Sequence, residues 1–253
     1  MLVVGHRGAP SLAPENTRAS FEAALAIGVD AIELDVHLSR DGHLVVIHDQ
    51  NLARTTNGKG LVHERDLAEL MVLDAGSWFS PSFVGERIPT FEEILLRIGR
   101  RVPLQVEIKG ATDGVVEATI AALRAHGLLN QSMITSFHLD RLPLVRALAP
   151  ATQIGALVWG RDRSNGRAMT PDECISATRA AGADVMLLWH ECIDEAMMTA
   201  ALSANLPVGA AGGTATEADM RRLLALGTIR MTTNFPDICR AVVRGSGASS
   251  PGS

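Results

Sequence analysis

Eight alternations of a short β-branched run with a helical pattern, spread over 253 residues, predict an α/β fold, a (β/α)8 TIM barrel with a small insertion after the second strand. A barrel of eight such units needs about 250 residues. An open doubly wound sheet normally ends after fewer units. We therefore expect one barrel domain over residues 1–243.

The predicted strands are the short apolar runs, of which AIELDVHL is the second. They cover residues 2–5, 31–38, 102–108, 131–136, 152–158, 184–188, 206–209 and 229–233. Helices are expected between them at 17–27, 90–98, 114–125, 139–148, 171–181, 194–204, 217–226 and 236–243. Residues 51–86 break the alternation with TTNGKG, the helical piece ERDLAELMVL and GSWFSPSF, so we expect a small cap there. The tail 244–253 is rich in Gly, Ser and Pro and is expected to be disordered.

Composition restricts the possible partners. The formal net charge is −5, and no run of Lys or Arg could follow a nucleic-acid backbone or an anionic membrane. We expect neither a nucleic-acid partner nor stable membrane association, since no window approaches the roughly 18 uncharged apolar residues of a membrane span.

The chain starts LVVGHRG without a secretion-signal pattern, which favours a cytoplasmic location. Three widely spaced cysteines predict neither disulfides nor a zinc site. Nothing in the sequence indicates an oligomeric state.

Three carboxylates fall on predicted strands near the end where a barrel carries its functional groups. Glu33 and Asp35 share one face of the second strand, and Glu107 lies in the third, within VEIKG. Converging carboxylates raise each other's pKa unless a cation lies between them. Oxygen donors alone favour Mg²⁺ or Ca²⁺ over zinc. The alternative is a buried ion-pair network with Arg7 and Lys109, and spacing alone favours neither.

Two histidines are expected at the same end of the barrel. His6 follows the first strand. The Asp-Gly pair at 41–42 indicates a two-residue hairpin, in a register that returns His48 to the level of Asp35. Both imidazoles titrate near neutrality and could act as general acid and general base. His37 is expected to point toward solvent, and the five remaining histidines are given structural roles.

Six motifs together resemble the glycerophosphodiester phosphodiesterase family in order and spacing. They are HRGAPSLAPENT, ELDVHLSRDGHLVVIHD, LARTTNGKG, RIPTFEEIL, VEIKG and TNFPD, and they extend over residues 3–237. The resemblance implies hydrolysis of glycerophosphodiesters to sn-glycerol 3-phosphate and an alcohol. It also implies that one divalent metal ion, Mg²⁺ or Ca²⁺, is bound by Glu33, Asp35 and Glu107, that His6 and His48 are the acid/base pair, and that Arg7 and Lys109 contact phosphate. Asn16 in PENT is expected to cap the first helix.

One departure from the family pattern concerns the alcohol side of the pocket. An aromatic residue is expected at the end of the seventh strand, but PVGAAGGTATEADM places Ala211 or Gly212 there. This predicts a roomier pocket with weak head-group discrimination. Trp159 and Trp189 could fill part of the gap, and Trp189 is the candidate for substrate binding.

Two other functions stay open at this point. A phospholipase D-type enzyme acting on lysolipids would share the barrel but would need access to membranes. A non-catalytic phospho-ligand binding protein could keep the fold, although all the predicted site positions hold chemically competent residues. Which histidine is the acid, which metal is used and which alcohol is released are left open by the sequence.

Overall fold

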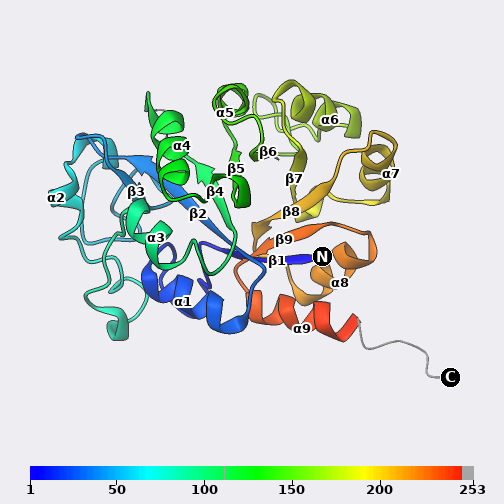
Figure 1. The fold of residues 1–253 in the computed structure, drawn as a ribbon. Coiled ribbons are helices and arrows are strands. Elements are labelled where there is room, and N and C mark those ends of the chain that lie inside the picture. Colours follow the sequence, from blue (N-terminus) through cyan, green and yellow to red (C-terminus); the bar gives the residue numbers. More distant parts are fainter. Residues whose placement is uncertain (111, 247–253) are drawn as a thin grey trace.

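The structure, a computed structural model, describes residues 1–110 and 112–246. Within these residues eight parallel strands form a ring, which β1 (Leu2–His6) closes by pairing with both β9 (Arg230–Thr233) and β2 (Ala31–Leu38). Helices surround the strands (Figure 1). The predicted (β/α)8 TIM barrel is confirmed. A further strand, β3 (Leu44–Val46), pairs antiparallel with β2.

Each strand of the ring is followed by a helix, as the alternation in the sequence predicts. The other strands are β4 (Leu104–Ile108), β5 (Met133–Ser136), β6 (Gln153–Val158), β7 (Val185–Trp189) and β8 (Val208–Gly213). The barrel helices are α1 (Arg18–Ile27), α3 (Phe91–Arg97), α4 (Val115–Ala125), α5 (Leu142–Leu148), α6 (Pro171–Ala180), α7 (Glu195–Ser203), α8 (Glu217–Ala225) and α9 (Pro236–Ser246). Most ends lie within three residues of prediction. The exception is β8, which continues four residues further because the flanking strands pair with its Gly- and Ala-rich backbone.

The two faces of β2 separate the hydrophobic core from the site. Ile32, Leu34 and Val36 belong to the large apolar cluster that packs the helices against the ring. Side chains alternate across a strand, so Glu33 and Asp35 point to the other face, into the barrel. Every residue of β2 is buried, because helices cover the outer face of the strand and the barrel interior covers the other.

The first helix begins one residue later than expected. The Thr17 side chain, not that of Asn16, accepts a hydrogen bond from the backbone N–H of Ser20 and caps α1. Asn16 lies just outside the helix at φ +57°. Its amide Nδ2 donates to Asp35 Oδ2 over 2.8 Å, so the expected capping role is replaced by a contact with the site.

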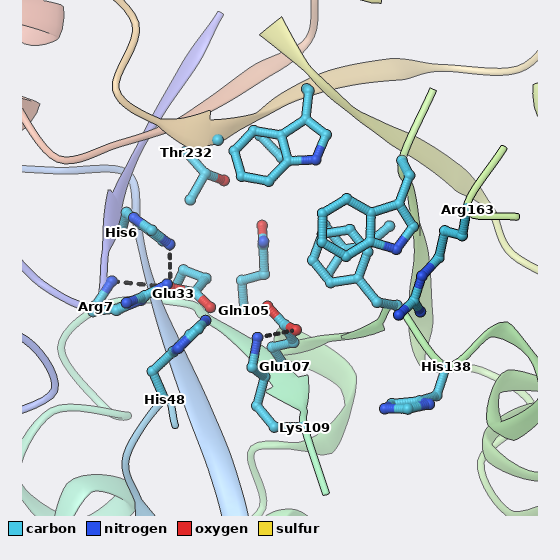
Figure 2. A pocket seen from close by; sticks show the side chains of 16 residues that line it. His6, Arg7, Glu33, His48, Gln105, Glu107, Lys109, His138, Arg163 and Thr232 are labelled. Atoms are coloured by element: carbon cyan, nitrogen blue, oxygen red, sulfur yellow. Dashed lines mark hydrogen bonds and ion pairs between the residues drawn. The ribbon is translucent and has the colours of Figure 1, made fainter. Parts of the chain in front are cut away.

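The hairpin after β2 has a register that differs from prediction by one residue. Val46 pairs with Val36, so Ile47 rather than His48 stands at the level of Asp35. The reason is the turn: Ser39 N–H donates to His43 O around a three-residue loop, with Gly42 at φ +81° as its last residue. Because β3 ends at Val46, the backbone at His48 is free of the strand alternation, and the imidazole still faces the barrel (Figure 2).

The segment after the hairpin holds short helical pieces, η1 (Val62–Glu64), α2 (Leu67–Leu70) and η2 (Pro81–Phe83). Its own apolar cluster joins it to β3: Val45, Ile47, Leu52, Val62, Leu70, Ala75 and Ile88. The remaining single turns are η3 (Leu129–Gln131), η4 (Leu139–Arg141) and η5 (His190–Cys192).

The C-terminal helix is longer than the sequence suggested. Residues 244–246, assigned to the disordered tail, form the last turn of α9. The rest of that tail, 247–253, lies outside the described residues. Among the residues that are described, no helix is long and apolar enough to cross a membrane.

Candidate active site

A cavity of about 430 Å³ opens where the strands of the barrel end. Seven of the eight residues singled out by the sequence line it: His6, Arg7, Glu33, His48, Glu107, Lys109 and Trp189. The eighth, Asp35, is fully buried beside it, with Arg7 Nε at 3.3 Å and Lys109 Nζ at 3.7 Å. Figure 2 shows the side chains of His6, Arg7, Glu33, His48, Glu107 and Lys109 converging from several strands, with the aromatic rings on the side of Arg163.

The three acidic residues meet as the strand faces predict. Asp35 and Glu107 are direct partners in the parallel pairing of β2 with β4, and Glu33 is one layer deeper. All three are buried, and each offers an oxygen atom that lies within 4.8 Å of the other two. Such a set is suited to a hard divalent cation, because it consists of oxygen donors alone.

The pKa values of these carboxyl groups show how unfavourable their proximity is without a cation. Burial, together with repulsion from Asp35 and Glu107, raises the pKa of Glu33 well above its usual range. Burial also raises the pKa of Glu107 to about 7, although Lys109 opposes the shift. Burial disfavours a charged Asp35 as well, but Arg7 and Lys109 beside it hold its pKa well below the usual range.

The ion-pair network that was the alternative to a metal is also present, and it is incomplete. Lys109 Nζ lies 2.8 Å from Glu107 Oε1, and Arg7 pairs with Asp35 and, at 2.7 Å, with Glu15. Within the described residues no Arg or Lys side chain forms an ion pair with Glu33, which accepts only the backbone N–H of Arg7 at 2.9 Å. Glu33 Oε1 and Asp35 Oδ1 are buried without a hydrogen-bond partner. The network therefore leaves room for one more cation.

His6 is oriented by a neutral partner. Its Nδ1 lies 2.5 Å from Asn234 Oδ1, and its Nε2 lies 4.0 Å from Glu33 Oε2. An amide oxygen only accepts, so the ring proton sits on Nδ1 and leaves Nε2 as the acceptor facing the cavity. Burial and the charge of Arg7 lower the pKa of His6 to about 3, against the opposing effect of Asn234.

His48 has a charged partner instead. Its Nδ1 lies 2.6 Å from Asp49 Oδ1, and Arg54 Nε bonds the second oxygen of Asp49. Arg54 also donates two hydrogen bonds of 2.8 and 2.9 Å to Glu15, so a residue of the insertion holds the histidine's partner in place. Burial lowers the pKa of His48, as do the charges of Arg7 and Lys109, while the charge of Asp35 and the hydrogen bond with Asp49 oppose the shift.

The expectation that His37 points toward solvent is wrong. The side chain is buried, and its Nε2 donates to the backbone carbonyl of His48 over 3.0 Å. A residue on the barrel-facing side of β2 thus fixes the irregular backbone that carries the second histidine.

Three aromatic rings form the opposite side of the cavity, and we call them the aromatic wall: Phe137, Trp159 and Trp189. Phe137 and Trp159 are stacked with centroids 4.2 Å apart, and Trp159 and Trp189 are tilted at 5.9 Å. Trp189 lies against Gly212, where a Cβ would come within 2.0 Å of the indole. Trp189 thus covers the position of the missing aromatic from the neighbouring strand, as the sequence allowed, and weak head-group discrimination stays a prediction.

Several lining residues were missed by sequence reasoning or given another role. They are Gln105, Phe137, His138, Arg163 and Thr232, with Asn234 behind His6. His138 had been given a structural role. Most of them lie at or just after the C-terminal end of a predicted strand, and this position could have indicated that they line the site. Only Arg163 lies on a longer loop, where sequence position does not indicate direction.

Comparison with known proteins agrees with this geometry. The pattern of the "Glycerophosphoryl diester phosphodiesterase family" matches residues 6–238. The chain is 35% identical over 261 residues to the glycerophosphodiester phosphodiesterase of Bacillus subtilis (strain 168), covering 97% of this chain and 87% of that protein. It is 32% identical over 244 residues to the glycerophosphodiester phosphodiesterase of Bacillus altitudinis, covering 93% and 95%.

Solved structures show the same architecture. A phosphodiesterase from Oleispira antarctica, in complex with the product sn-glycerol-3-phosphate, superposes with a TM-score of 0.85 at 28% identity, covering 96% of this chain and 97% of that chain. The glycerophosphodiester phosphodiesterase of Agrobacterium tumefaciens str. C58 superposes with a TM-score of 0.81 at 28% identity, covering 95% and 99%.

Proposed function

The chain belongs to the glycerophosphoryl diester phosphodiesterase family and is thus a phosphoric diester hydrolase, and from this we propose that it converts glycerophosphodiesters to sn-glycerol 3-phosphate and an alcohol with one bound divalent metal ion, Mg²⁺ or Ca²⁺. The observation that supports the metal is that Glu33 Oε1 and Asp35 Oδ1 are buried without a hydrogen-bond partner, with Lys109 Nζ 3.7 Å from the Asp35 oxygen. With Glu107 they form a compact oxygen-donor set that the two neighbouring cations do not neutralise.

The proposed roles follow from charge. When bound, the metal ion supplies positive charge next to the phosphoryl oxygens, where negative charge builds in the transition state. Arg7 and Lys109 hold fixed positive charges at the same place, each anchored by Asp35. These contacts are stronger in the transition state than with the singly charged substrate, and that difference lowers the barrier.

The two histidines receive different roles from their different partners. His6, held by the neutral Asn234, accepts a proton at Nε2 from the nucleophile. The nucleophile is water, or it is the neighbouring glycerol hydroxyl, in which case water then opens the cyclic phosphodiester to give glycerol 3-phosphate. His48, held by the Asp49 carboxylate, delivers a proton to the oxygen of the departing alcohol, which would otherwise leave as an alkoxide. In this proposal His6 is the general base and His48 the general acid, an order that the sequence left open.

Trp189 belongs to the alcohol side of the proposed substrate site, together with the rest of the aromatic wall. The phosphate lies between this wall and the carboxylates in the proposed complex. The cytoplasmic location and the single-domain boundaries remain predictions, and cell fractionation would test the first of them.

The test is a coupled assay. Protein stripped with chelator and then supplied with Mg²⁺ or Ca²⁺ is incubated with a panel of glycerophosphodiesters, and released glycerol 3-phosphate is oxidised by its dehydrogenase. We expect activity only with metal. Full activity in the stripped protein would refute the metal site. Lysophosphatidylcholine vesicles in a parallel arm would reveal a phospholipase D-type enzyme, and ester binding without turnover would reveal a binding protein.

A further inference from the structure

The half of the cavity that faces the alcohol carries a positive charge of its own. Arg163, on the loop after β6, places its Cζ 5.5 Å from the centre of the Trp159 ring. Lys109 Nζ lies 5.7 Å from the centre of the Phe137 ring. In Figure 2 Arg163 flanks the aromatic wall on the side away from His6. Two of the three rings are therefore already in contact with cations of the chain itself.

An aromatic wall is usually suited to a quaternary ammonium group, because the ring faces attract positive charge. Here such a head group would have to displace Arg163 or lie between Arg163 and Lys109, where both would repel it. The contacts within the chain thus weaken the attraction for a choline-like cation, because two of the three rings already face a cation.

Carboxylates that could offset this charge are missing from that half of the cavity. The acidic residues among its lining are Glu33 and Glu107, both on the metal side. Across the residues that the structure describes, Arg163 forms no ion pair with a carboxylate, whereas its neighbour Arg167 is held by Glu173 at 2.7 Å. Asp162 is engaged within the loop by Ser164 and Asn165.

A second cavity continues the site behind the wall. It measures about 360 Å³ and shares Phe137, Trp159 and Arg163 with the first cavity. Arg161 also lines it and, in the described part of the chain, has no carboxylate within ion-pair distance. The same cavity is lined by Arg167 and Glu173, which pair with each other, and by Asp162. Three guanidinium groups therefore face two carboxylates, which leaves a net positive charge beside the substrate pocket.

We propose that Arg163 determines alcohol specificity by selecting glycerophosphodiesters whose alcohol carries a second negative charge, such as a phosphate monoester, over those with a cationic head group. This inference rests on the proposed function and concerns the alcohol half of the same site. The guanidinium receives the second anion at the rim, while the phosphodiester stays beside Lys109 and the carboxylates. Because Arg163 is exposed, water and salt screen the effect, which makes it one of preference rather than of strict exclusion.

The experiment compares three substrates under one metal condition. These are glycerophosphocholine, the neutral glycerophosphoglycerol, and the same glycerol ester carrying a phosphate on its distal hydroxyl. We expect kcat/KM to rise in that order, with the phosphorylated ester about tenfold above the choline ester at low salt. Arg163→Gln should reduce this ratio by about three- to tenfold, and Arg163→Glu should reduce it further. The control is Arg100→Gln, an exposed arginine before β4 at the opposite end of the barrel, which should leave the ratio unchanged.

The outcomes separate the two proposals. The proposed role of Arg163 is overturned if Arg163→Gln leaves the ratio of kcat/KM values unchanged. It is also overturned if the unmodified protein prefers the choline ester. Absence of turnover with every ester refutes the proposed function instead. In that case calorimetric binding of the same three esters to the His6→Ala protein and to the His6→Ala, Arg163→Gln protein still decides whether Arg163 discriminates between them.

Discussion

At the scale of single residues, the site is defined by which partner each ionisable group has. His6 contacts the neutral Asn234, whereas His48 contacts the carboxylate of Asp49. This difference in charge is the basis for proposing different roles for the two histidines, which the sequence could not distinguish. Neither partner was assigned a role from sequence, because a residue's partner depends on which strands are neighbours in space. The carboxylates behaved differently: Glu33 and Asp35 lie on one face simply because they are two apart in a strand.

The histidine roles lead to a first prediction. His6→Ala and His48→Ala should each lower kcat by about 10²–10⁴, the usual effect of removing a positioned acid or base. His126→Ala is the control, because that residue follows α4 and does not line the cavity; its Nε2 lies 3.9 Å from Glu92 Oε1. Steady-state kinetics with glycerophosphoglycerol measures all three. Equal losses in the control and in either site variant would contradict a catalytic role.

At the scale of elements, the end of one strand and the neighbour of another decide which side chains face the cavity. The hairpin register is off by one residue, which would turn His48 away if β3 were longer, yet the strand ends at Val46. Likewise β8 lacks an aromatic residue, yet Trp189 of the neighbouring β7 covers the gap. A one-residue shift in register moves every side chain of a regular strand to the other face of the sheet. The direction of a side chain near a strand end therefore depends on where the strand stops as well as on its register.

The contact between β7 and β8 gives a second prediction. Gly212→Ala should destabilise the protein by about 3 kcal/mol or more, since φ is +107° there and the new Cβ would overlap the Trp189 indole. Gly182→Ala is the matched control: φ is +67° and nothing lies within 4 Å, so about 1 kcal/mol is expected. Urea denaturation gives both values. Similar losses at the two glycines would show that Trp189 moves aside freely.

The insertion gives a third prediction through Asp74. This carboxylate accepts backbone N–H groups of Gly76, Ser77 and Gly85, and these bonds lower its pKa. A lowered pKa means that the carboxylate stabilises the fold above its ordinary pKa and loses that contribution as the pH falls through the lowered value. Hydrogen exchange of residues 74–86 should therefore accelerate in acid, relative to α4.

The Asp74→Asn variant provides the comparison for that measurement. It should show the faster exchange already at neutral pH, because an amide oxygen accepts more weakly than a carboxylate. An exchange rate in the insertion that is independent of both pH and the substitution would exclude this role for Asp74.

At the scale of the whole molecule, closure of the barrel concentrates negative charge at one end, which leads to a fourth prediction. Glu33→Gln should raise the melting temperature of the metal-free protein, because it removes a carboxyl group whose ionised form is disfavoured by burial and by Asp35 and Glu107, which raise its pKa. The same substitution should weaken the stabilisation that Mg²⁺ or Ca²⁺ confers on the unmodified protein. Calorimetric scans with and without metal measure both effects.

The control for this prediction is Glu117→Gln, at an exposed position of α4. It should change neither the melting temperature of the metal-free protein nor its response to metal. If Glu33→Gln lowered the stability of the metal-free protein and left the metal response intact, the carboxylates would be structural and not metal ligands.

The barrel and the polar side of its site could be predicted from local patterns in the sequence. Eight alternations require eight strands, the period of two places Glu33 with Asp35, and functional groups collect where parallel strands end. The tertiary structure alone decided the register of the hairpin, the partners of His6 and His48, and the aromatic wall with Arg163 beside it. The physical reason is range: strand faces follow from the covalent spacing of neighbours along the chain, whereas turns, loop directions and ring contacts follow from packing between residues distant in sequence.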